Sequence, residues 1–594
     1  MTNGQIIIFA ILGGVLVFFV WGRWRYDLTA FTALLVGVLT GVVPMEEAFR
    51  GFGHPAVITV AAVLVISRAL SNSGAVDLVA RFVAPATERH AVAHIGALGA
   101  LAAGLSAFMN NVGALALLLP VALRSAAKTG RSPAVILMPL SFASILGGLA
   151  TLIGTPPNII VATYRAEVEG EAFGMFDFTP VGGVVALAGL LFVTFIGWRL
   201  IPKARREKKS PEELFDIADY VTEARVPEGS SILGQSLGEA ENMAEKQEAT
   251  IIGLIRGERR LFGPNRRWRI KTGDVLVIEA PPEAIDKVVT AMGLELVGSD
   301  EDILKDLKSE DWTLMEVVVT PRSRIERRTA GGLHLRSRYG VNLLAVSREG
   351  RPVRSRLKSF RFRAGDVLLL QGNKNEMPEI VGELGCLPLA ERHLQLGRRK
   401  WIWVSIAIFA VAVLGATFGL ITPAIALAVA VAALVLLNIV SPEEAYRSVD
   451  WSVIILLGAM IPIGGAMVAT GATELIASAI HDIAGGVSPV VVLVLLLIVT
   501  MTLSDVINNA ATAVVMAPIA VGIAAEMGAS PDPFLMAVAV GASCAFLTPI
   551  GHQNNMLIMG PGGYRFGDYW RMGLPLELVV VAVATPLILL IWPF

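Results

Sequence analysis

Ser106-Ala-Phe-Met-Asn110-Asn111 is a polar stretch inside long hydrophobic sequence, and Ser504-Asp-Val-Ile-Asn508-Asn509 repeats it in the second half of the chain. Further along each half, Thr151-Leu-Ile-Gly154-Thr-Pro-Pro-Asn158 is matched by Thr548-Pro-Ile-Gly551-His-Gln-Asn-Asn555. Amides, glycine and proline at matching places of two hydrophobic halves predict broken membrane helices that surround a solute-binding site.

The composition favours a membrane protein. The 594 residues are 54% hydrophobic and 17% charged, with a mean hydropathy of +0.65, which is more apolar than a typical soluble chain. The formal net charge of −1 argues against a nucleic-acid partner, and the sequence contains no nucleic-acid motif. The two cysteines, Cys386 and Cys544, are too few for a disulfide framework.

The hydrophobic residues divide the chain into three blocks. Residues 1–200 and 400–594 contain long apolar runs, whereas residues 201–399 are polar and charged. Since a helix needs about 20 apolar residues to cross a bilayer, we expect an α-helical polytopic membrane protein with a polar insert. The predicted spans lie at about 4–21, 28–45, 54–72, 133–163 and 177–199, and again at about 401–418, 421–440, 451–470, 533–561 and 573–592.

Between the third and fourth spans of each half lies an apolar stretch, 91–123 or 488–525, that an asparagine pair interrupts. Two full crossings need about 40 apolar residues, so each stretch is predicted to be a re-entrant hairpin with a polar tip. Each half then has five spans and one hairpin. Because five is odd, the second half is expected to be upside down relative to the first, which is an inverted repeat.

Other matched landmarks support a duplication. Glu46-Glu47-Ala-Phe-Arg50 matches Glu443-Glu444-Ala-Tyr-Arg447. Gly74-Ala-Val-Asp-Leu-Val-Ala matches Gly471-Ala-Thr-Glu-Leu-Ile-Ala, where a short amphipathic interfacial helix is expected. Because the matches follow the same order, residues 1–200 and 400–594 are predicted to be a first and a second (inverted) membrane repeat.

Lysine and arginine in the short loops set the expected orientation. Basic residues gather in the loops of one side, at Arg23 and Arg25, at 124–131 and at 203–206, whereas the loop 164–176 is net acidic. The basic loops are therefore expected to face the cytoplasm. This orientation predicts a multi-pass protein of the cell inner (plasma) membrane, with both termini outside and residues 201–399 cytoplasmic.

Residues 201–399 contain two copies of one soluble module, expected at 201–298 and 299–399. Ala249-Thr-Ile-Ile-Gly-Leu-Ile-Arg256 aligns with Val341-Asn-Leu-Leu-Ala-Val-Ser-Arg348, and Gly273-Asp274 aligns with Gly365-Asp366. Short apolar strands ended by Gly-Asp turns predict a small α+β domain. The modules resemble the RCK C-terminal (TrkA-C) domain, which implies a regulatory role and an unknown small ligand. The alternative is an insert that serves only structure or solubility.

The interrupted helices predict the chemistry of the site. A break in a membrane helix persists only where it is buried or lines a cavity. Half-helix N-termini offer N–H groups to an anion, and exposed carbonyl, Ser, Asn and Thr oxygens suit Na⁺. This combination suits a small oxyanion or carboxylate with a cation beside it. The alternative is that the polar side chains only join packed helices.

On these motifs the chain resembles the divalent anion:sodium symporter family of the ion transporter superfamily, in its branch with two inserted RCK C-terminal domains. The motifs are the two hairpins, the two Thr-x-x-Gly-x-x-x-Asn breaks and Gly560-Pro-Gly-Gly-Tyr564. The resemblance implies secondary active, Na⁺-coupled symport of sulfate or a di- or tricarboxylate, an elevator-type motion and a homodimer in the lipid bilayer. It implies no organic cofactor.

The resemblance also implies the site residues. The substrate is expected to contact Asn110, Asn111, Val112, Thr155, Pro156, Asn508, Asn509, Ala510 and His552. Sodium is expected at Ser106, Asn110, Gly154, Asn158, Ser504, Asp505, Asn508, Gly551 and Asn555. The hairpin signature of the family is Ser-Asn-Thr, whereas the tips here read Asn-Asn-Val and Asn-Asn-Ala, which leaves the substrate open.

Asp505 and His552 have no chemical counterpart in the first half, where Ala107 and Thr155 stand. An ionisable group at membrane depth is unfavourable and is first considered functional. Asp505 is therefore a candidate ligand of Na⁺ or of a proton, and His552 is a candidate anion contact or titrating group. The alternatives are an aspartate at a helix end near water and a histidine hydrogen-bonded within the packing.

Three functions remain open from the sequence. The first is Na⁺-coupled import of a small anion. The second is a proton-coupled or cation/proton-exchanging transporter of the same superfamily, and the third is a sensor that binds solute without moving it. The sequence contains no Walker loop and no other enzyme motif, so neither ATP-driven transport nor enzymatic activity is expected.

Overall fold

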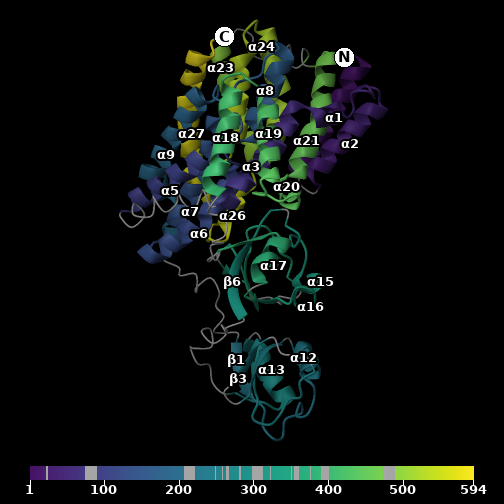
Figure 1. Cartoon of the computed structure of the whole chain (residues 1–594), viewed down its shortest axis with the longest axis vertical. Helices are drawn as coiled ribbons and strands as arrows, with labels where there is room; N and C mark the ends of the chain where they lie inside the picture. Colours follow the sequence, from purple (N-terminus) through teal and green to yellow (C-terminus); the bar gives the residue numbers. More distant parts are fainter. Residues whose placement is uncertain are drawn as a thin grey trace. The chain divides into compact units, whose positions relative to one another are not determined.

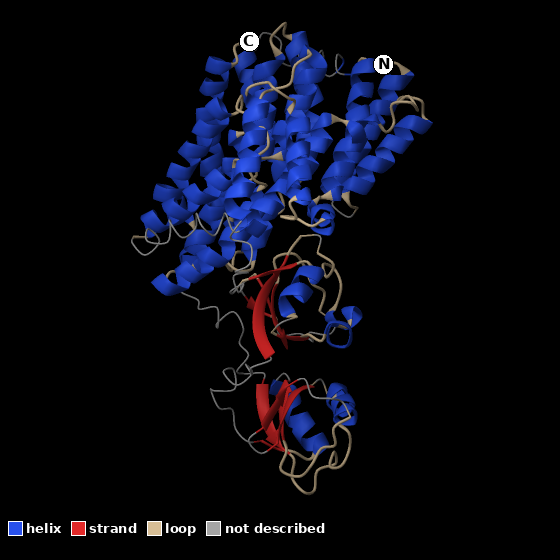
Figure 2. Cartoon of the chain, in the orientation of Figure 1, coloured by secondary structure: helices blue, strands red, loops and turns tan. Residues whose placement is uncertain are grey.

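The structure is a computed structural model that describes residues 1–21, 24–73, 90–206, 221–247, 249–256, 259–262, 267–279, 282–296, 312–321, 323–349, 351–353, 360–374, 376–389, 401–472, 475 and 488–594. The chain divides into two compact units. The helical unit comprises Met1–Arg206, Leu394–Ile558 and Arg565–Phe594, and the sheet-containing unit comprises Glu207–His393 and Met559–Tyr564 (Figure 2). The expected interfacial helices at 74–80 and 471–477 lie outside the described residues, apart from three positions of the second.

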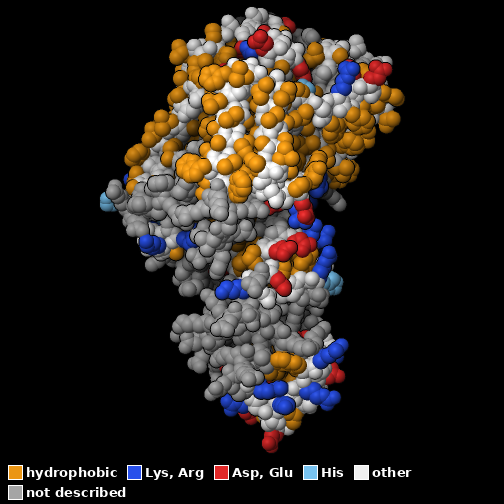
Figure 3. Space-filling view, in the orientation of Figure 1, with side chains coloured by type: hydrophobic (Ala, Val, Ile, Leu, Met, Phe, Trp, Pro, Cys, Tyr) orange, Lys and Arg blue, Asp and Glu red, His pale blue; other side chains and the backbone are white. Residues whose placement is uncertain are grey.

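The helical unit follows the apolar runs of the sequence. Within the described residues, eight helices are long and apolar enough to cross a membrane. Apolar side chains cover much of the face of this unit that Figure 3 shows. The first half contains α1 (Asn3–Trp21), α2 (Tyr26–Leu39), α3 (Pro55–Ser73), α5 (Ala91–Ser106), α6 (Asn111–Thr129), α7 (Pro133–Gly147), α8 (Pro156–Glu169) and α9 (Val184–Phe192). The second contains α18 (Ile402–Thr417), α19 (Pro423–Leu436), α21 (Trp451–Ala469), α23 (Pro489–Val506), α24 (Asn509–Glu526), α25 (Pro531–Ser543), α26 (Gln553–Met559) and α27 (Trp570–Ile591).

Two helices end earlier than the sequence predicts. α2 stops at Leu39 rather than near residue 45, and α19 stops at Leu436 rather than near residue 440. Shortly after each end lies a residue with left-handed backbone, Gly41 (φ 77°) or Asn438 (φ 55°). Such a residue turns the chain away from the helix axis and ends the helix. The predicted spans were too long because an apolar run does not reveal where a helix stops.

The predicted spans 133–163 and 533–561 are each interrupted at the Thr-x-x-Gly-x-x-x-Asn motif. The first consists of α7, a 3-10 turn (Gly148–Ala150), an irregular segment and α8, and the second of α25, an irregular segment and α26. The hairpins are interrupted at their asparagine pairs. Their second helices, α6 and α24, have 19 and 18 residues and are each long enough to cross a membrane. Helix length therefore does not require these hairpins to be re-entrant, and their re-entrance stays a prediction.

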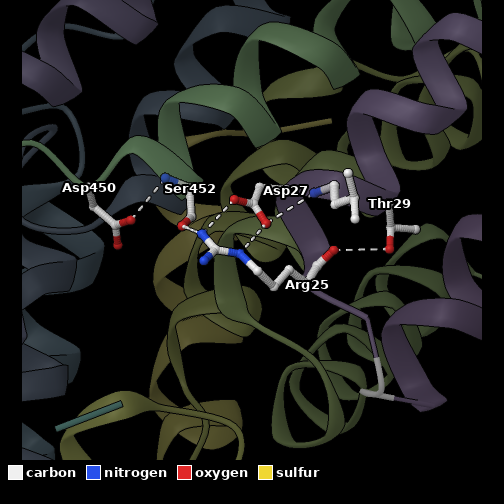
Figure 4. Close-up of polar contacts among 6 residues, drawn as sticks. Arg25, Asp27, Thr29, Asp450 and Ser452 are labelled. Atoms are coloured by element: carbon white, nitrogen blue, oxygen red, sulfur yellow. Dashed lines mark hydrogen bonds and ion pairs between the residues drawn. The ribbon is translucent and has the colours of Figure 1, made fainter. Parts of the chain in front are cut away.

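Each half packs its second helix on the third helix of the other half. α2 lies against α21, and α19 lies against α3. Figure 4 shows the polar end of the first contact, where Arg25 donates to Asp27 (2.8 Å) and to Ser452 Oγ (2.9 Å). Asp450 caps α21 by accepting from the N–H of Ser452 (3.1 Å). The two halves are thus interleaved rather than separate, and both chain ends lie at the same end of the helical unit (Figure 1).

The other unit contains two five-stranded antiparallel sheets of one design. The strand order is β3-β2-β4-β1-β5 in the first and β8-β7-β9-β6-β10 in the second. Buried apolar residues of helices complete each core, from α12 (Leu237–Lys246) and α13 (Pro282–Met292) in the first and from α15 (Ala330–Leu333), α16 (Leu335–Tyr339) and α17 (Met377–Leu384) in the second. The strands are β1 (Val221–Arg225), β2 (Thr250–Arg256), β3 (Arg259–Phe262), β4 (Val275–Glu279), β5 (Glu295–Leu296), β6 (Trp312–Val319), β7 (Asn342–Arg348), β8 (Arg351–Pro352), β9 (Val367–Asn373) and β10 (Cys386–Pro388).

An arginine–aspartate pair braces the same place in both sheets. Arg256 on β2 lies 2.7 Å from the carboxylate of Asp274, and Arg348 on β7 lies 2.7 Å from that of Asp366. Each arginine also donates to a backbone carbonyl, and each aspartate follows a glycine with left-handed backbone. The predicted alignment of these strands and of their Gly-Asp turns agrees with the structure.

Candidate solute and cation site

The tip residues Asn110 and Asn508 have the same local role. The backbone of each is extended, and its side-chain oxygen accepts from an N–H in the first turn of the following helix, at Val112 (3.1 Å) or Ala510 (2.9 Å). Such an N-cap satisfies a helix N–H that has no partner within the helix. The amide oxygens are used inside the hairpins, whereas the side-chain NH₂ groups of Asn110 and Asn508 make no hydrogen bond within the described part of the chain.

The next residue differs between the halves. Asn111 is buried, with its side-chain oxygen 2.6 Å from Ser106 Oγ and its backbone carbonyl accepting from Ser144 Oγ (2.9 Å). Asn509 is partly exposed, and its side-chain oxygen accepts only from the adjacent N–H of Ala510 (2.9 Å). Equivalent positions of the two tips therefore have different environments.

An asparagine spans each helix break in the same way. The side-chain NH₂ of Asn158 donates to the carbonyls of Gly148 (3.3 Å) and Thr151 (2.8 Å). The NH₂ of Asn555 donates to the carbonyls of Ala545 (3.0 Å) and Thr548 (3.2 Å). Because buried carbonyls need partners, these amides stabilise the breaks inside the packed helices.

Each break is also bonded to the hairpin of its own half. The hydroxyl of Thr151 donates to the carbonyl of Ala107, and that of Thr548 donates to the carbonyl of Asp505 (2.6 Å). Ser504 Oγ donates to the carbonyl of Ala542 (2.6 Å). The motifs that repeat in the sequence therefore come together in space within each half.

The first hairpin is joined to the second break across the two halves. His552 Nε2 lies 3.3 Å from the side-chain nitrogen of Asn111. Asn554 donates to the carbonyl of Asn111 (3.3 Å) and to Ser144 Oγ (3.2 Å), and Ser141 Oγ donates to Asn555 Oδ1 (2.8 Å). This buried polar group is made from both halves of the chain.

The second tip takes no part in that group. Within the described residues, no hydrogen bond joins Asn508 or Asn509 to the first half. Its helix α24 packs instead against α8, the helix that follows the first break. The predicted residues Thr155 and Pro156 lie at the start of that helix, with Thr155 as its N-cap and Pro156 as its first residue.

The two predicted glycines allow close backbone approach. A Cβ atom at Gly551 would lie 2.7 Å from the carbonyl oxygen of Ser504, and one at Gly154 would lie 2.5 Å from that of Gly148. Both distances are shorter than a side chain tolerates, so both positions require glycine in this packing. Gly551 thereby brings the second break onto the end of the first helix of its hairpin.

Several buried oxygens at the breaks have no hydrogen-bond partner. Within the described residues they are Thr155 Oγ1, Asn158 Oδ1, Asp505 Oδ2 and Asn554 Oδ1. An unpaired buried oxygen is unfavourable unless a ligand, ion or water satisfies it. Neutral and anionic oxygens near breaks are suitable ligands of Na⁺.

The sequence did not predict three polar residues of the buried group that joins the two halves. Ser141 and Ser144 lie one helical turn apart on α7, inside an apolar run that offered no polar motif. Asn554 stands within the repeated Thr548–Asn555 motif, but its matching residue is Pro157, so the repeat did not single it out. All three are small polar residues in helices that are buried on all sides, and this is the feature by which a sequence could reveal them.

A helical membrane unit whose interrupted helices meet at buried amides defines a membrane transport protein. The sequence model of the citrate transporter (CitMHS) family matches residues 16–541, and the chain belongs to this family. Both the family and the relatives below are transporters rather than enzymes.

Two relatives match over almost the whole chain. The "Uncharacterized transporter sll0640" of Synechocystis sp. is 30% identical over 98% of this chain and 96% of its own, and the "Uncharacterized transporter YfbS" of Escherichia coli is 29% identical over 100% of both. "Sodium/sulfate cotransporter 2" of Chlamydomonas reinhardtii is 24% identical over 58% of this chain and 40% of its own.

Proposed function

We propose that this protein is a secondary active transporter that imports a small anion, sulfate or a di- or tricarboxylate, together with Na⁺. The observation that carries the proposal is the buried hydrogen-bonded group in which the first hairpin, through Asn111, meets His552 and Asn554 of the second break. The family description, citrate transporter, and a relative named sodium/sulfate cotransporter support an anion and Na⁺ as the transported species.

The anion is proposed to bind neutral donors. The caps fix the side chains of Asn110 and Asn508, and their NH₂ groups remain free for a ligand. The N-termini of α6 and α24 add N–H groups and the positive end of the helix dipole. The full set proposed for the substrate is Asn110, Asn111, Val112, Thr155, Pro156, Asn508, Asn509, Ala510 and His552.

Sodium is proposed to bind oxygen atoms at the two breaks. Thr155 Oγ1, Asn158 Oδ1 and Asp505 Oδ2 are buried and have no hydrogen-bond partner among the residues that the structure describes. Residues that only joined packed helices would have these oxygens paired, so the unpaired oxygens favour a cation over the packing alternative. The proposed set also includes Ser106, Asn110, Gly154, Ser504, Asn508, Gly551 and Asn555.

The remaining organisation belongs to the same proposal. The reciprocal packing of α2 on α21 and of α19 on α3 supports an inverted repeat of 1–200 and 400–594. We further propose a homodimer with an elevator-type motion, both termini outside the inner membrane, and cytoplasmic RCK C-terminal-like domains at 201–298 and 299–399 that bind a regulatory ligand.

Uptake into proteoliposomes tests the proposal. The purified chain is reconstituted and supplied with labelled sulfate or citrate under an inward Na⁺ gradient, an inward K⁺ gradient or a pH gradient. We expect the Na⁺ gradient to accelerate uptake of one of the two anions, and protein-free liposomes give the background. Acceleration by the pH gradient alone would favour the proton-coupled alternative, and binding without uptake would favour a sensor.

A further inference from the structure

Glu577 is a buried carboxyl group that no repeated motif contains. It lies on α27 with 8% of its surface exposed, and its Oε1 has no hydrogen-bond partner. In the first half, the π-helix Thr179–Gly183 and the helix α9 that follows it contain no acidic residue. Glu577 is therefore an asymmetric addition to the second half, as Asp505 is.

The carboxyl groups of Asp505 and Glu577 are close enough to interact electrostatically. Glu577 lies one helical turn after Gly573, and a Cβ atom at Gly573 would collide with the carbonyl oxygen of Phe546, which precedes Leu547 in the second break. Asp505 is 3% exposed; its Oδ1 accepts from the N–H of Leu547 (2.8 Å), and its Oδ2 is unpaired. Three elements, α23, α27 and the break, thus bring two unpaired carboxyl oxygens to one place.

Two buried carboxyl groups in contact need a shared proton or a bound cation between them. Like charges repel strongly away from water, and an unpaired buried charge is more unfavourable still. Within the described residues, neither Asp505 nor Glu577 forms an ion pair with arginine or lysine. A proton shared by the two groups or a bound cation can supply this compensation, and the unpaired Asp505 Oδ2 and Glu577 Oε1 of the described residues suit a cation.

We propose that Asp505 and Glu577 together bind Na⁺, so that α27 supplies a ligand to the cation site of the second half. The cation's identity rests on the proposed function, and the carboxylate pair adds a site residue outside the hairpins and breaks. Because the first half has no such pair, the two halves bind Na⁺ unequally, with the stronger site at Asp505 and Glu577.

The test is Na⁺-dependent stabilisation of the full-length protein in detergent. The unfolding midpoint is followed while NaCl replaces choline chloride at constant ionic strength, since a ligand that binds the native state raises its apparent stability. Glu577→Gln is expected to raise the half-saturating Na⁺ concentration by about tenfold or more, equivalent to about 1.4 kcal/mol of binding free energy. Glu526→Gln, an exposed carboxylate at the end of α24, is the matched control and should leave the titration unchanged.

The outcomes separate this inference from the proposed function. A wild-type protein that Na⁺ does not stabilise would overturn Na⁺ coupling itself. A wild-type response that Glu577→Gln leaves unchanged would overturn only the role of Glu577. If Glu577→Gln does not fold, Glu577→Asp keeps the charge but shortens the side chain, and an unchanged half-saturating concentration in that variant would equally refute the pair.

Discussion

The two soluble copies and the two membrane halves have diverged in different ways. Both sheets keep the same strand order and the same arginine–aspartate brace. The membrane halves keep the asparagine across each break, but among the described residues only the first hairpin tip is hydrogen-bonded to the opposite half. Contacts that repeat therefore hold the duplicated fold, whereas contacts that do not repeat mark where the halves act together.

The brace of the sheets gives the largest expected effect. Arg256→Ala and Arg348→Ala each leave an aspartate with a side chain 2% exposed and without its cation. The arginines are 37% and 26% exposed, so only the aspartates are buried. Leaving a buried charged acceptor without its charged donor costs about 3 kcal/mol, and we expect a similar loss of stability in both copies. Hydrogen exchange of β2 and β7 in the full chain measures it.

An exposed pair provides the control for the brace. Arg324 and Glu383 are 63% and 44% exposed, so Arg324→Ala should change stability by less than about 1 kcal/mol. A large loss of stability in one of the variants Arg256→Ala and Arg348→Ala, with no loss in the other, would contradict the equivalence of the two sheets.

The asparagines across the breaks come next. Asn158→Ala and Asn555→Ala each remove two hydrogen bonds to buried carbonyls, which should lower stability by about 2 kcal/mol, although the carbonyl of Thr151 still accepts from the N–H of Gly154 (3.4 Å). The loss should be larger for Asn555, because Ser141 then also lacks its acceptor. Thermal unfolding in detergent compares the two, and an equal or larger loss for Asn158→Ala would remove this asymmetry.

Substitutions at the two hairpin tips should differ in their effect on the transport rate rather than on stability. Asn111→Ala removes the contacts with Ser106 and His552, so anion uptake should fall by about tenfold or more. Asn509→Ala removes a proposed substrate contact but, within the described residues, a hydrogen bond only with its own neighbour, so uptake should fall less than in Asn111→Ala. Initial rates of anion uptake in proteoliposomes measure both effects. Equal losses of uptake would mean that the two tips contribute equally to transport.

The smallest effect is expected at Ser141. Its hydroxyl makes one buried hydrogen bond between the halves, to Asn555, so Ser141→Ala should lower stability by about 1 kcal/mol. Thr32→Ala, which removes an exposed bond within α2, should change stability by less than about 0.5 kcal/mol. Indistinguishable unfolding midpoints for the two variants would argue that the Ser141 bond contributes nothing.

The sequence predicted the repeated motifs and, within them, the unrepeated Asp505 and His552, but it missed Ser141, Ser144 and Glu577, which lie outside the motifs. Asn158 and Asn555 could be found because a broken helix needs glycine, proline and an amide at fixed spacing, and this need appears twice. Ser144 and Glu577 stand alone in apolar helices, and their partners are distant in sequence. Such contacts depend on how helices pack, which local pattern does not encode. The helix ends at Leu39 and Leu436 were missed because hydropathy continues beyond the stop.

A double-mutant cycle tests the central claim most directly, that the first tip and the second break form one ligand site. Anion binding in saturating Na⁺ is measured for Asn111→Ala, His552→Ala and the double variant, and for the matching pair Asn509→Ala and Thr155→Ala. We predict a coupling free energy of at least about 1 kcal/mol for Asn111 with His552, and additivity within about 0.5 kcal/mol for the matching pair. Additive losses for Asn111 and His552 would contradict the claim.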